Sequence, residues 1–269
     1  MSYENLTLTV ADSIATLTLN RPAVLNALNP ELLRDLRHAL DSVAANREAR
    51  VLVMTGAGKG FCAGADLAAA AGRKPDPQYQ TLGDSVAASM YEWHNRVIQK
   101  LWDMPKPVVS SINGVAAGGG VGLALTADIV VAAKSASFVC VFAPKLGIAP
   151  DMGATFHLQR LVGRSRALGM AMLGDKVSAE QALDWGMIYQ VVDDTELQAA
   201  TGRIAARLAA SPPLVFPRIR QGFAHAETAT MAEQLAWEAE AQRFLCATQD
   251  FQEGVAAFVQ KRPPVFQGK

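Results

Sequence analysis

The first fifty residues show two distinct spacings of hydrophobic and polar positions. Over residues 6–22 (LTLTVADSIATLTLNRP) the two kinds of residue alternate, which predicts two short strands joined by a turn at residues 11–13. After this hairpin the leucines recur at helical spacing, with Asn29 as N-cap, Pro30 at the first helical position and Glu31 in the first turn. The pattern therefore predicts a β-hairpin followed by an amphipathic helix.

Further along, short and almost entirely apolar segments predict buried strands. They cover residues 49–58, 106–114 and 127–140. Strands that alternate with helices are typical of an α/β architecture. After about Leu197 the strand patterns stop, and the remaining segments with helical spacing lie at residues 196–210, 230–247 and 250–262. We therefore expect an α/β core domain over residues 1–197 and a C-terminal helical region over residues 198–269.

One segment of the core carries neither spacing. Residues 68–89 are rich in alanine, glycine, proline and polar residues. This composition predicts a mobile loop.

The composition is that of a compact globular enzyme. Of the 269 residues half are hydrophobic and 19% are charged, and the formal net charge is zero, so nothing favours a nucleic acid as partner. The three cysteines have no pairing spacing, which suits a reducing compartment. The start of the chain has no basic segment followed by an apolar run, and no stretch of eighteen apolar residues occurs. We expect a cytoplasmic protein that does not bind membranes.

Two glycine-rich loops are the strongest candidates for chemistry. GKGFCAGADL at residues 58–67 and NGVAAGGGVGLAL at residues 113–125 each follow a strand and lead into a helix. Glycine lets the backbone approach a ligand closely, and a helix N-terminus presents unpaired N–H groups. Two such loops can direct one N–H each at a single oxygen, as in an oxyanion hole. The alternative for either loop is tight helix–sheet packing that requires small residues.

Other motifs are absent. Lys59 is followed by glycine where a phosphate-binding loop needs serine or threonine, and neither loop contains G-x-G-x-x-G. The chain has no G-x-S-x-G motif, and its four histidines are far apart with no pair at i,i+4. We therefore expect no nucleotide loop, no serine hydrolase site and no metal site.

The two loops together resemble the signature of the enoyl-CoA hydratase/isomerase (crotonase) superfamily. The resemblance covers the whole chain, including residues 172–194 (MLGDKVSAEQALDWGMIYQVVDD) and residues 253–269 (EGVAAFVQKRPPVFQGK). These stretches and PKLGIAPD at residues 144–151 are most similar to the ring-1,2-epoxyphenylacetyl-CoA isomerases of phenylacetate degradation. The resemblance implies a crotonase (ClpP-like) fold of repeated ββα units in a spiral, and a homotrimer or a homohexamer made of two trimers through the C-terminal helices.

The resemblance also implies where an acyl-CoA thioester binds. Its carbonyl oxygen is expected between the N–H groups of Ala63 and Gly119, which would form the oxyanion hole. Coenzyme A is part of the substrate, and no other cofactor is implied. The expected acyl-CoA contacts are Val24, Leu25, Ala27, Ala63, Gly64, Ala65, Asp66, Gly119, Phe258 and Lys261, the last two often reaching across a subunit boundary. The alternative for Lys261 is a solvated charge on its helix.

The acid and base groups differ from those of hydratases. Hydratases of this superfamily use two glutamates, and the matching positions here are Gly122 and Ala143. Asp151 matches the acid with which isomerases of the superfamily move a proton along the acyl chain; the alternative is an N-cap for the following helix. His94, in YEWHNRV, is a second catalytic candidate, because aryl-CoA dehalogenases place a Trp-His pair in this helix; otherwise it lines the pocket wall.

These residues favour an acyl-CoA isomerase that acts through a thioester enolate, with Asp151 as the proton shuttle. An enoyl-CoA hydratase or an aryl-CoA dehalogenase is the alternative among enzymes. From another class, the alternative is an RNA-binding or non-catalytic homologue.

Overall fold

The alternating N-terminal segment forms the predicted hairpin. The computed structural model describes residues 3–70 and 77–269. Strand β1 (Leu6–Ala11) pairs antiparallel with β2 (Ile14–Leu19). The two residues between them, Asp12 and Ser13, have φ angles of 50° and 62°, which a tight turn requires.

Two sheets form the core, and the chain crosses repeatedly from one to the other. The first sheet has the order β1-β2-β3-β5-β7-β10 and the second β4-β6-β8-β9. Each of the successive pairs β3–β4, β5–β6 and β7–β8 contributes one strand to each sheet, which is the expected repeated unit. The remaining strands are β3 (Val51–Gly56), β4 (Gly60–Cys62), β5 (Val108–Ile112), β6 (Val115–Ala117), β7 (Ile129–Ala133), β8 (Ser137–Val139), β9 (Lys176–Ser178) and β10 (Gln190–Val192).

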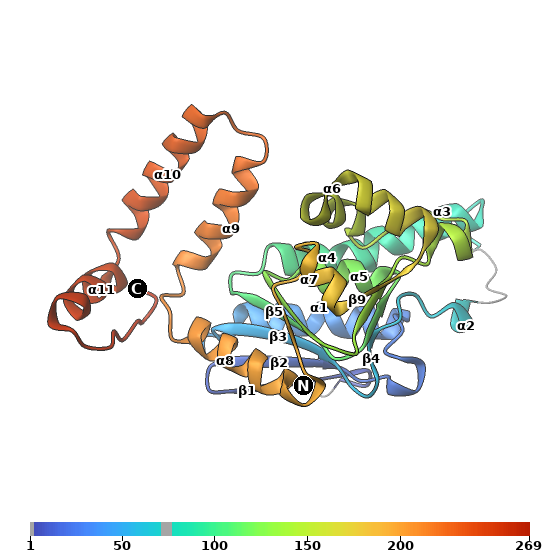
Figure 1. Cartoon of the computed structure of the whole chain (residues 1–269), viewed down its shortest axis with the longest axis horizontal. Coiled ribbons are helices and arrows are strands. Elements are labelled where there is room, and N and C mark those ends of the chain that lie inside the picture. Colours follow the sequence, from blue (N-terminus) through green and yellow to red (C-terminus); the bar gives the residue numbers. More distant parts are fainter. Residues whose placement is uncertain (1–2, 71–76) are drawn as a thin grey trace.

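The helices of the core pack around these sheets (Figure 1). Asn29 caps the first of them as predicted, because its Oδ1 accepts a hydrogen bond of 2.9 Å from the Leu32 N–H. The elements are the 3₁₀ turn η1 (Pro22–Val24), α1 (Pro30–Ala45), α2 (Leu67–Ala70), α3 (Leu82–Ser89), the π-helical turn η2 (Met90–His94), α4 (Asn95–Trp102), α5 (Gly119–Leu125), the π-helical turn η3 (Phe142–Leu146), α6 (Ala154–Leu173) and α7 (Ala179–Asp184).

The predicted loop at residues 68–89 is wrong at its C-terminal end. Helix α3 occupies that end and begins with a capping box, in which Thr81 and Asp84 bond to each other's backbone N–H. At the other end, α2 extends into the segment. Residues 71–76 of the predicted loop lie outside the described residues.

The chain beyond the last strand is helical, as predicted. After the 3₁₀ turn η4 (Asp194–Glu196) it forms α8 (Leu197–Ala209), α9 (Val215–Ala226), α10 (Met231–Leu245) and α11 (Gln249–Gln260), of which α9 was not predicted. Figure 1 shows α9 and α10 side by side, projecting away from the sheets. By contrast, α8 packs on the first sheet, where Ala205 and Ala209 meet Val53 and Val109. In the described part of the chain, no helix has the length and apolar character needed to cross a membrane.

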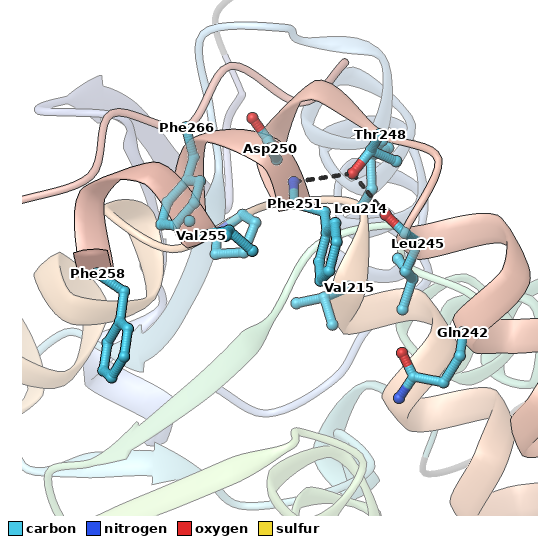
Figure 2. A pocket seen from close by; sticks show the side chains of 12 residues that line it. Leu214, Val215, Gln242, Leu245, Thr248, Asp250, Phe251, Val255, Phe258 and Phe266 are labelled. Carbon is cyan, nitrogen blue, oxygen red and sulfur yellow. Dashed lines mark hydrogen bonds between the residues drawn. The ribbon is translucent and has the colours of Figure 1, made fainter. Parts of the chain in front are cut away.

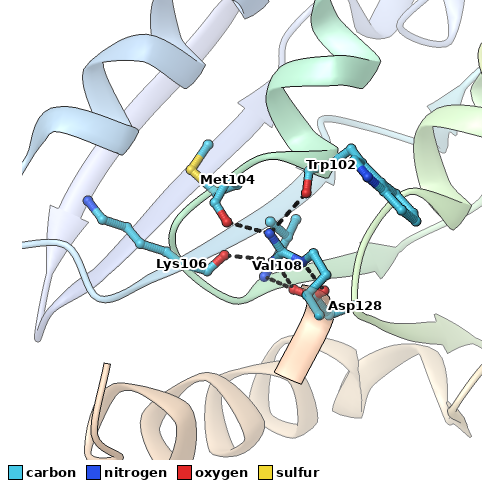
Figure 3. Close-up of polar contacts among 6 residues, drawn as sticks. Trp102, Met104, Lys106, Val108 and Asp128 are labelled. Atoms are coloured by element: carbon cyan, nitrogen blue, oxygen red, sulfur yellow. Dashed lines mark hydrogen bonds and ion pairs between the residues drawn. The ribbon is translucent and has the colours of Figure 1, made fainter. Parts of the chain in front are cut away.

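Arg220 on α9 links this helix to the core through hydrogen bonds and an ion pair. The guanidinium of Arg220 donates to both carboxylate oxygens of Asp128, at 2.8 and 2.6 Å, and to the carbonyls of Trp102, Met104 and Lys106 (Figure 3). Bidentate pairing with a carboxylate is the strongest geometry open to arginine. This cluster therefore fixes where the projecting helices leave the sheets.

Candidate active site

Asp151 lies in a turn of unusual backbone conformation just before α6. The two residues after it, Met152 and Gly153, both have positive φ angles, 52° and 78°. The N-cap of α6 is Gly153, so the alternative that Asp151 caps this helix does not hold. A methionine in this conformation costs free energy, which is typical of turns that position functional groups.

The turn places the Asp151 carboxylate against the second glycine-rich loop. A Cβ atom added to Gly119 would lie 3.1 Å from Asp151 Oδ1 and 3.0 Å from Met152 Cγ. Oδ1 is buried and has no hydrogen-bond partner within the described residues. Burial raises the pKa of Asp151, an effect that nearby His94 opposes. A carboxylate in this setting takes up a proton more readily than one in water.

The two glycine-rich loops touch each other. A Cβ atom on Gly64, whose φ is 83°, would lie 2.7 Å from the Ala117 carbonyl oxygen and 3.1 Å from the Gly119 nitrogen. Only glycine allows this approach of the two backbones. The loops therefore meet at Gly119, beside Asp151, as the oxyanion-hole hypothesis requires.

The donor predicted from the first loop is wrong. The N–H of Ala63 already donates to the Leu25 carbonyl at 2.9 Å and cannot serve a ligand. The backbone of Leu28 pairs with the residues on either side of Ala65. Its N–H donates to the Gly64 carbonyl at 2.7 Å, and its carbonyl accepts from the Asp66 N–H at 3.0 Å. Between those two bonds the N–H of Ala65 has no partner in the described part of the chain, and the same holds for Gly119. The free pair of donors is therefore Ala65 and Gly119.

Sequence reasoning missed the residue that holds the first loop in place. The fully buried side chain of Asn26 accepts from the Arg21 N–H at 2.8 Å and donates to the carbonyls of Ala57 and Gly60 at 3.0 and 2.8 Å. The sequence did offer a signal for this role, since Asn26 stands between apolar neighbours. An amide buried there needs hydrogen-bond partners on the protein.

Three of the expected CoA contacts, Val24, Leu25 and Ala27, flank Asn26 in the sequence. Val24 and Leu25 are exposed at 42% and 38%, whereas Ala27 is buried. The Arg21 guanidinium bonds to the Ala27 carbonyl at 2.5 Å and to the Asp66 carboxylate at 2.9 Å. Asp66 is thus part of the scaffold that joins the two segments.

Four of the predicted site residues line one cavity of about 260 Å³: Ala65, Asp66, His94 and Asp151. Its other lining residues are Leu28, Asn29, Pro30, Leu33, Leu67, Leu82, Ser85, Val86, Ser89, Met90 and Ile148. The interior is mostly apolar, as is usual for a small-molecule site.

His94 reaches this cavity through the π-helical turn η2. Its Nδ1 lies 3.4 Å from the Ser89 carbonyl oxygen. Burial lowers the pKa of His94, and the Ser89 carbonyl and Asp151 oppose that shift. Single π turns inside helices occur frequently at functional sites. The imidazole and the Asp151 carboxylate thus share one cavity.

Phe258 and Lys261 are not brought to this cavity within one chain. Phe258 is 85% exposed and lines a different cavity of about 410 Å³, between α11 and the ends of α9 and α10 (Figure 2). Lys261 is exposed and ends α11 with a φ of 53°. Their role in CoA binding stays a prediction.

The two positions that match hydratase glutamates cannot supply a carboxylate. A Cβ atom on Gly122 would lie 2.2 Å from the Met152 carbonyl oxygen, so no side chain fits there. Ala143 lies on the exposed turn η3. No group of three or more metal-ligating side chains occurs among residues 3–70 and 77–269.

Comparison with known proteins shows the family of the chain. The sequence pattern of the family described as enoyl-CoA hydratase/isomerase matches residues 9–269. The chain belongs to this family. It is 45% identical to the 1,2-epoxyphenylacetyl-CoA isomerase of Escherichia coli, over 97% of both chains. It is 38% identical, over the full length of both, to a probable enoyl-CoA hydratase of Rhodobacter capsulatus.

Solved structures of the family confirm the fold. The enoyl-CoA hydratase of Bacillus anthracis superposes with a TM-score of 0.91 at 30% identity, over 99% of this chain and all of that one. The crotonase fold expected from the sequence is therefore correct. Relatives named as isomerases and as hydratases both occur, so family membership alone leaves the two reactions open.

Proposed function

We propose that the protein is an acyl-CoA isomerase that transfers a proton within an aryl- or enoyl-CoA thioester. The observation that supports this best is the carboxylate of Asp151, whose buried Oδ1 lies against Gly119 and has no hydrogen-bond partner among the described residues. A reaction that removes a proton and returns it elsewhere on the same substrate needs one group that acts first as base and then as acid.

In the first step the ionised Asp151 removes a proton from the carbon next to the thioester carbonyl. The electron pair moves onto the carbonyl oxygen, and the resulting enolate is held by the N–H groups of Ala65 and Gly119. In the second step the protonated Asp151 returns the proton at a carbon further along the acyl chain, and the double bond moves while the thioester re-forms. Atoms and charge balance without a co-substrate.

The raised pKa of Asp151 suits both halves of this cycle. Burial makes the carboxylate a stronger base than an exposed aspartate, while its acid form still releases the proton. His94 would orient the acyl group or assist the transfer, since it lines the same cavity.

We propose that CoA enters along the exposed residues Val24 and Leu25 and passes Gly64 to reach the cavity. Phe258 and Lys261 would contribute from a neighbouring subunit of a trimer or hexamer, because within one chain they lie away from the cavity.

An enoyl-CoA hydratase is the second candidate, since the Rhodobacter capsulatus relative bears that name. The blocked space at Gly122 argues against it. An aryl-CoA dehalogenase would use Asp151 as a nucleophile beside His94. An RNA-binding or non-catalytic role is not favoured by the zero net charge or by the two free backbone donors.

The test is a panel of enoyl- and aryl-CoA thioesters assayed with wild type and Asp151→Asn. We expect double-bond migration in a 3-enoyl-CoA, negligible hydration of crotonyl-CoA, and no covalent aryl-aspartyl adduct by mass spectrometry. Hydration at about 10 per second or faster contradicts the proposal, because that rate is typical of an efficient enzyme. An adduct with a halogenated aryl-CoA supports the dehalogenase instead.

A further inference from the structure

One polar side chain in the cavity has no explanation in the mechanism. Ser85 lies on α3 and is only 9% exposed, and it lines the same cavity as Asp151 and His94. Its backbone N–H donates to the Thr81 carbonyl at 3.2 Å. Its hydroxyl makes no hydrogen bond with any described residue.

Apart from Ser89, the other polar side chains that line the cavity have partners or roles. Asn29 Oδ1 caps α1, and Asp66 pairs with Arg21. Asp151 and His94 have the roles proposed above. Ser89 is less buried than Ser85. The Ser85 hydroxyl is therefore a donor on the cavity wall that no described residue accepts.

Around Ser85 the wall is apolar. Leu82 and Val86 flank it on α3, and Leu33 and Ile148 line the cavity from other elements. A hydroxyl among such side chains loses free energy if a hydrocarbon group displaces its water and offers no acceptor. An acyl group that carries an oxygen atom avoids this loss, because the oxygen accepts the hydroxyl proton.

We propose that Ser85 is a specificity residue whose hydroxyl donates a hydrogen bond to an oxygen atom on the acyl group, beyond the thioester. The site then selects oxygen-bearing acyl groups over plain hydrocarbon groups of similar shape. This inference rests on the proposed function, since it requires the acyl group of a CoA thioester to occupy the cavity.

The experiment measures binding of unreactive thioesters by titration calorimetry. The probes are phenylacetyl-CoA and its 2-, 3- and 4-hydroxy derivatives, which differ by one oxygen. We expect the wild type to bind at least one hydroxylated thioester about five- to tenfold more tightly than phenylacetyl-CoA, the range of one net hydrogen bond. In Ser85→Ala that preference disappears, while phenylacetyl-CoA binds at least as tightly as before.

Ser42→Ala is the matched control, because it makes the same change at an exposed helical position outside the cavity. It is expected to keep the wild-type preference. The proposal is overturned if the wild type shows no preference, or if Ser85→Ala retains it. Binding of none of the thioesters overturns the proposed acyl-CoA site itself, and this inference with it, so the two failures are distinguishable.

Discussion

The catalytic role proposed for Asp151 has a cost in stability. Burial raises its pKa in the folded protein, so the folded state holds the proton more tightly than the unfolded chain does. The free energy of unfolding therefore decreases as the pH rises from the ordinary aspartate pKa through the raised value. At pH 7 the buried, ionised carboxylate destabilises the fold.

Asp151→Asn is accordingly expected to lower turnover by about 10²-fold or more while raising the melting temperature at pH 7. The difference in stability between the two proteins should narrow as the pH falls to the ordinary aspartate pKa, because the raised pKa of Asp151 leaves the wild-type carboxyl mostly neutral there. Thermal unfolding at both pH values and a 3-enoyl-CoA assay check this. Full turnover together with a lower melting temperature would mean that Asp151 is structural and that the base must be sought at His94.

His157 predicts a second pH effect, of opposite sign. Its Nε2 lies 3.2 Å from the hydroxyl of Thr126, which in turn donates to the Gly122 carbonyl at 2.8 Å. Burial, aided by Arg160, lowers the pKa of His157 to about 4. The unfolded chain therefore binds a proton first as the pH falls from about 6.5 towards about 4, and stability is lost over that window.

Replacing the His157 imidazole should make the free energy of unfolding depend less on pH. We expect His157→Gln to lose less stability than wild type between pH 7 and pH 5, measured by urea unfolding. If the free energy of unfolding falls equally with pH in both proteins, His157 titrates at its ordinary pKa. That result would contradict its burial as a neutral group.

Gly122 gives the sharpest steric prediction. Gly122→Ala drives a methyl group into the Met152 carbonyl, so we expect a loss of about 1–3 kcal/mol in urea unfolding and reduced turnover. Gly169→Ala in α6 is the matched control, since its added methyl meets nothing within 4 Å. That change should leave turnover intact and be neutral or stabilising. Equal stability of the two variants would contradict the contact.

At the scale of elements, structure that depends on local residue spacing can be predicted from the sequence. Structure that depends on contacts between distant residues cannot. The hairpin, the Asn29 cap and the strand-to-helix loops follow from spacing and turn chemistry. The choice between the N–H groups of Ala63 and Ala65 does not, because it depends on hydrogen bonds to Leu25 and Leu28, more than thirty residues earlier. Likewise, the alanine- and glycine-rich composition of residues 68–89 concealed α3, although its capping box was present in the sequence.

The attachment of α9 is an element-scale property that can be tested. Arg220→Lys keeps the charge but loses the planar fork that reaches Asp128 and three carbonyls. We expect stability to fall by roughly 1–3 kcal/mol and amide hydrogen exchange in α9 to quicken. Arg207→Lys, at an exposed position on α8, should change neither quantity. Unchanged exchange in α9 would show that its attachment does not depend on Arg220.

At the scale of the whole molecule, the C-terminal helices α9, α10 and α11 carry large apolar side chains that are exposed in the single chain. Phe223, Met231, Phe258 and Val259 are each exposed by 73% or more. Exposed apolar side chains mark interfaces where they gather into a large patch. The division between residues 1–197 and 198–269, and the trimer or hexamer, remain proposals that rest on this surface and on the resemblance.

We therefore expect light scattering at micromolar concentration to give three or six times the chain mass of 28.6 kDa. Phe258→Asp with Val259→Asp should lower that mass and weaken acyl-CoA binding together. Gln252→Asp adds charge at an exposed position on the same helix and is the control. A monomeric wild type would contradict the proposed assembly.

The contact between Gly122 and Met152 also constrains how this protein could change its reaction during evolution. A glutamate at position 122 has no room until the turn at residues 151–153 moves, yet moving that turn displaces Asp151 from Gly119. With the proton transfer proposed above, a lineage that passes to hydration at this site would therefore lose the first activity before gaining the second. Such a passage is favoured after gene duplication, when a second copy preserves the original reaction.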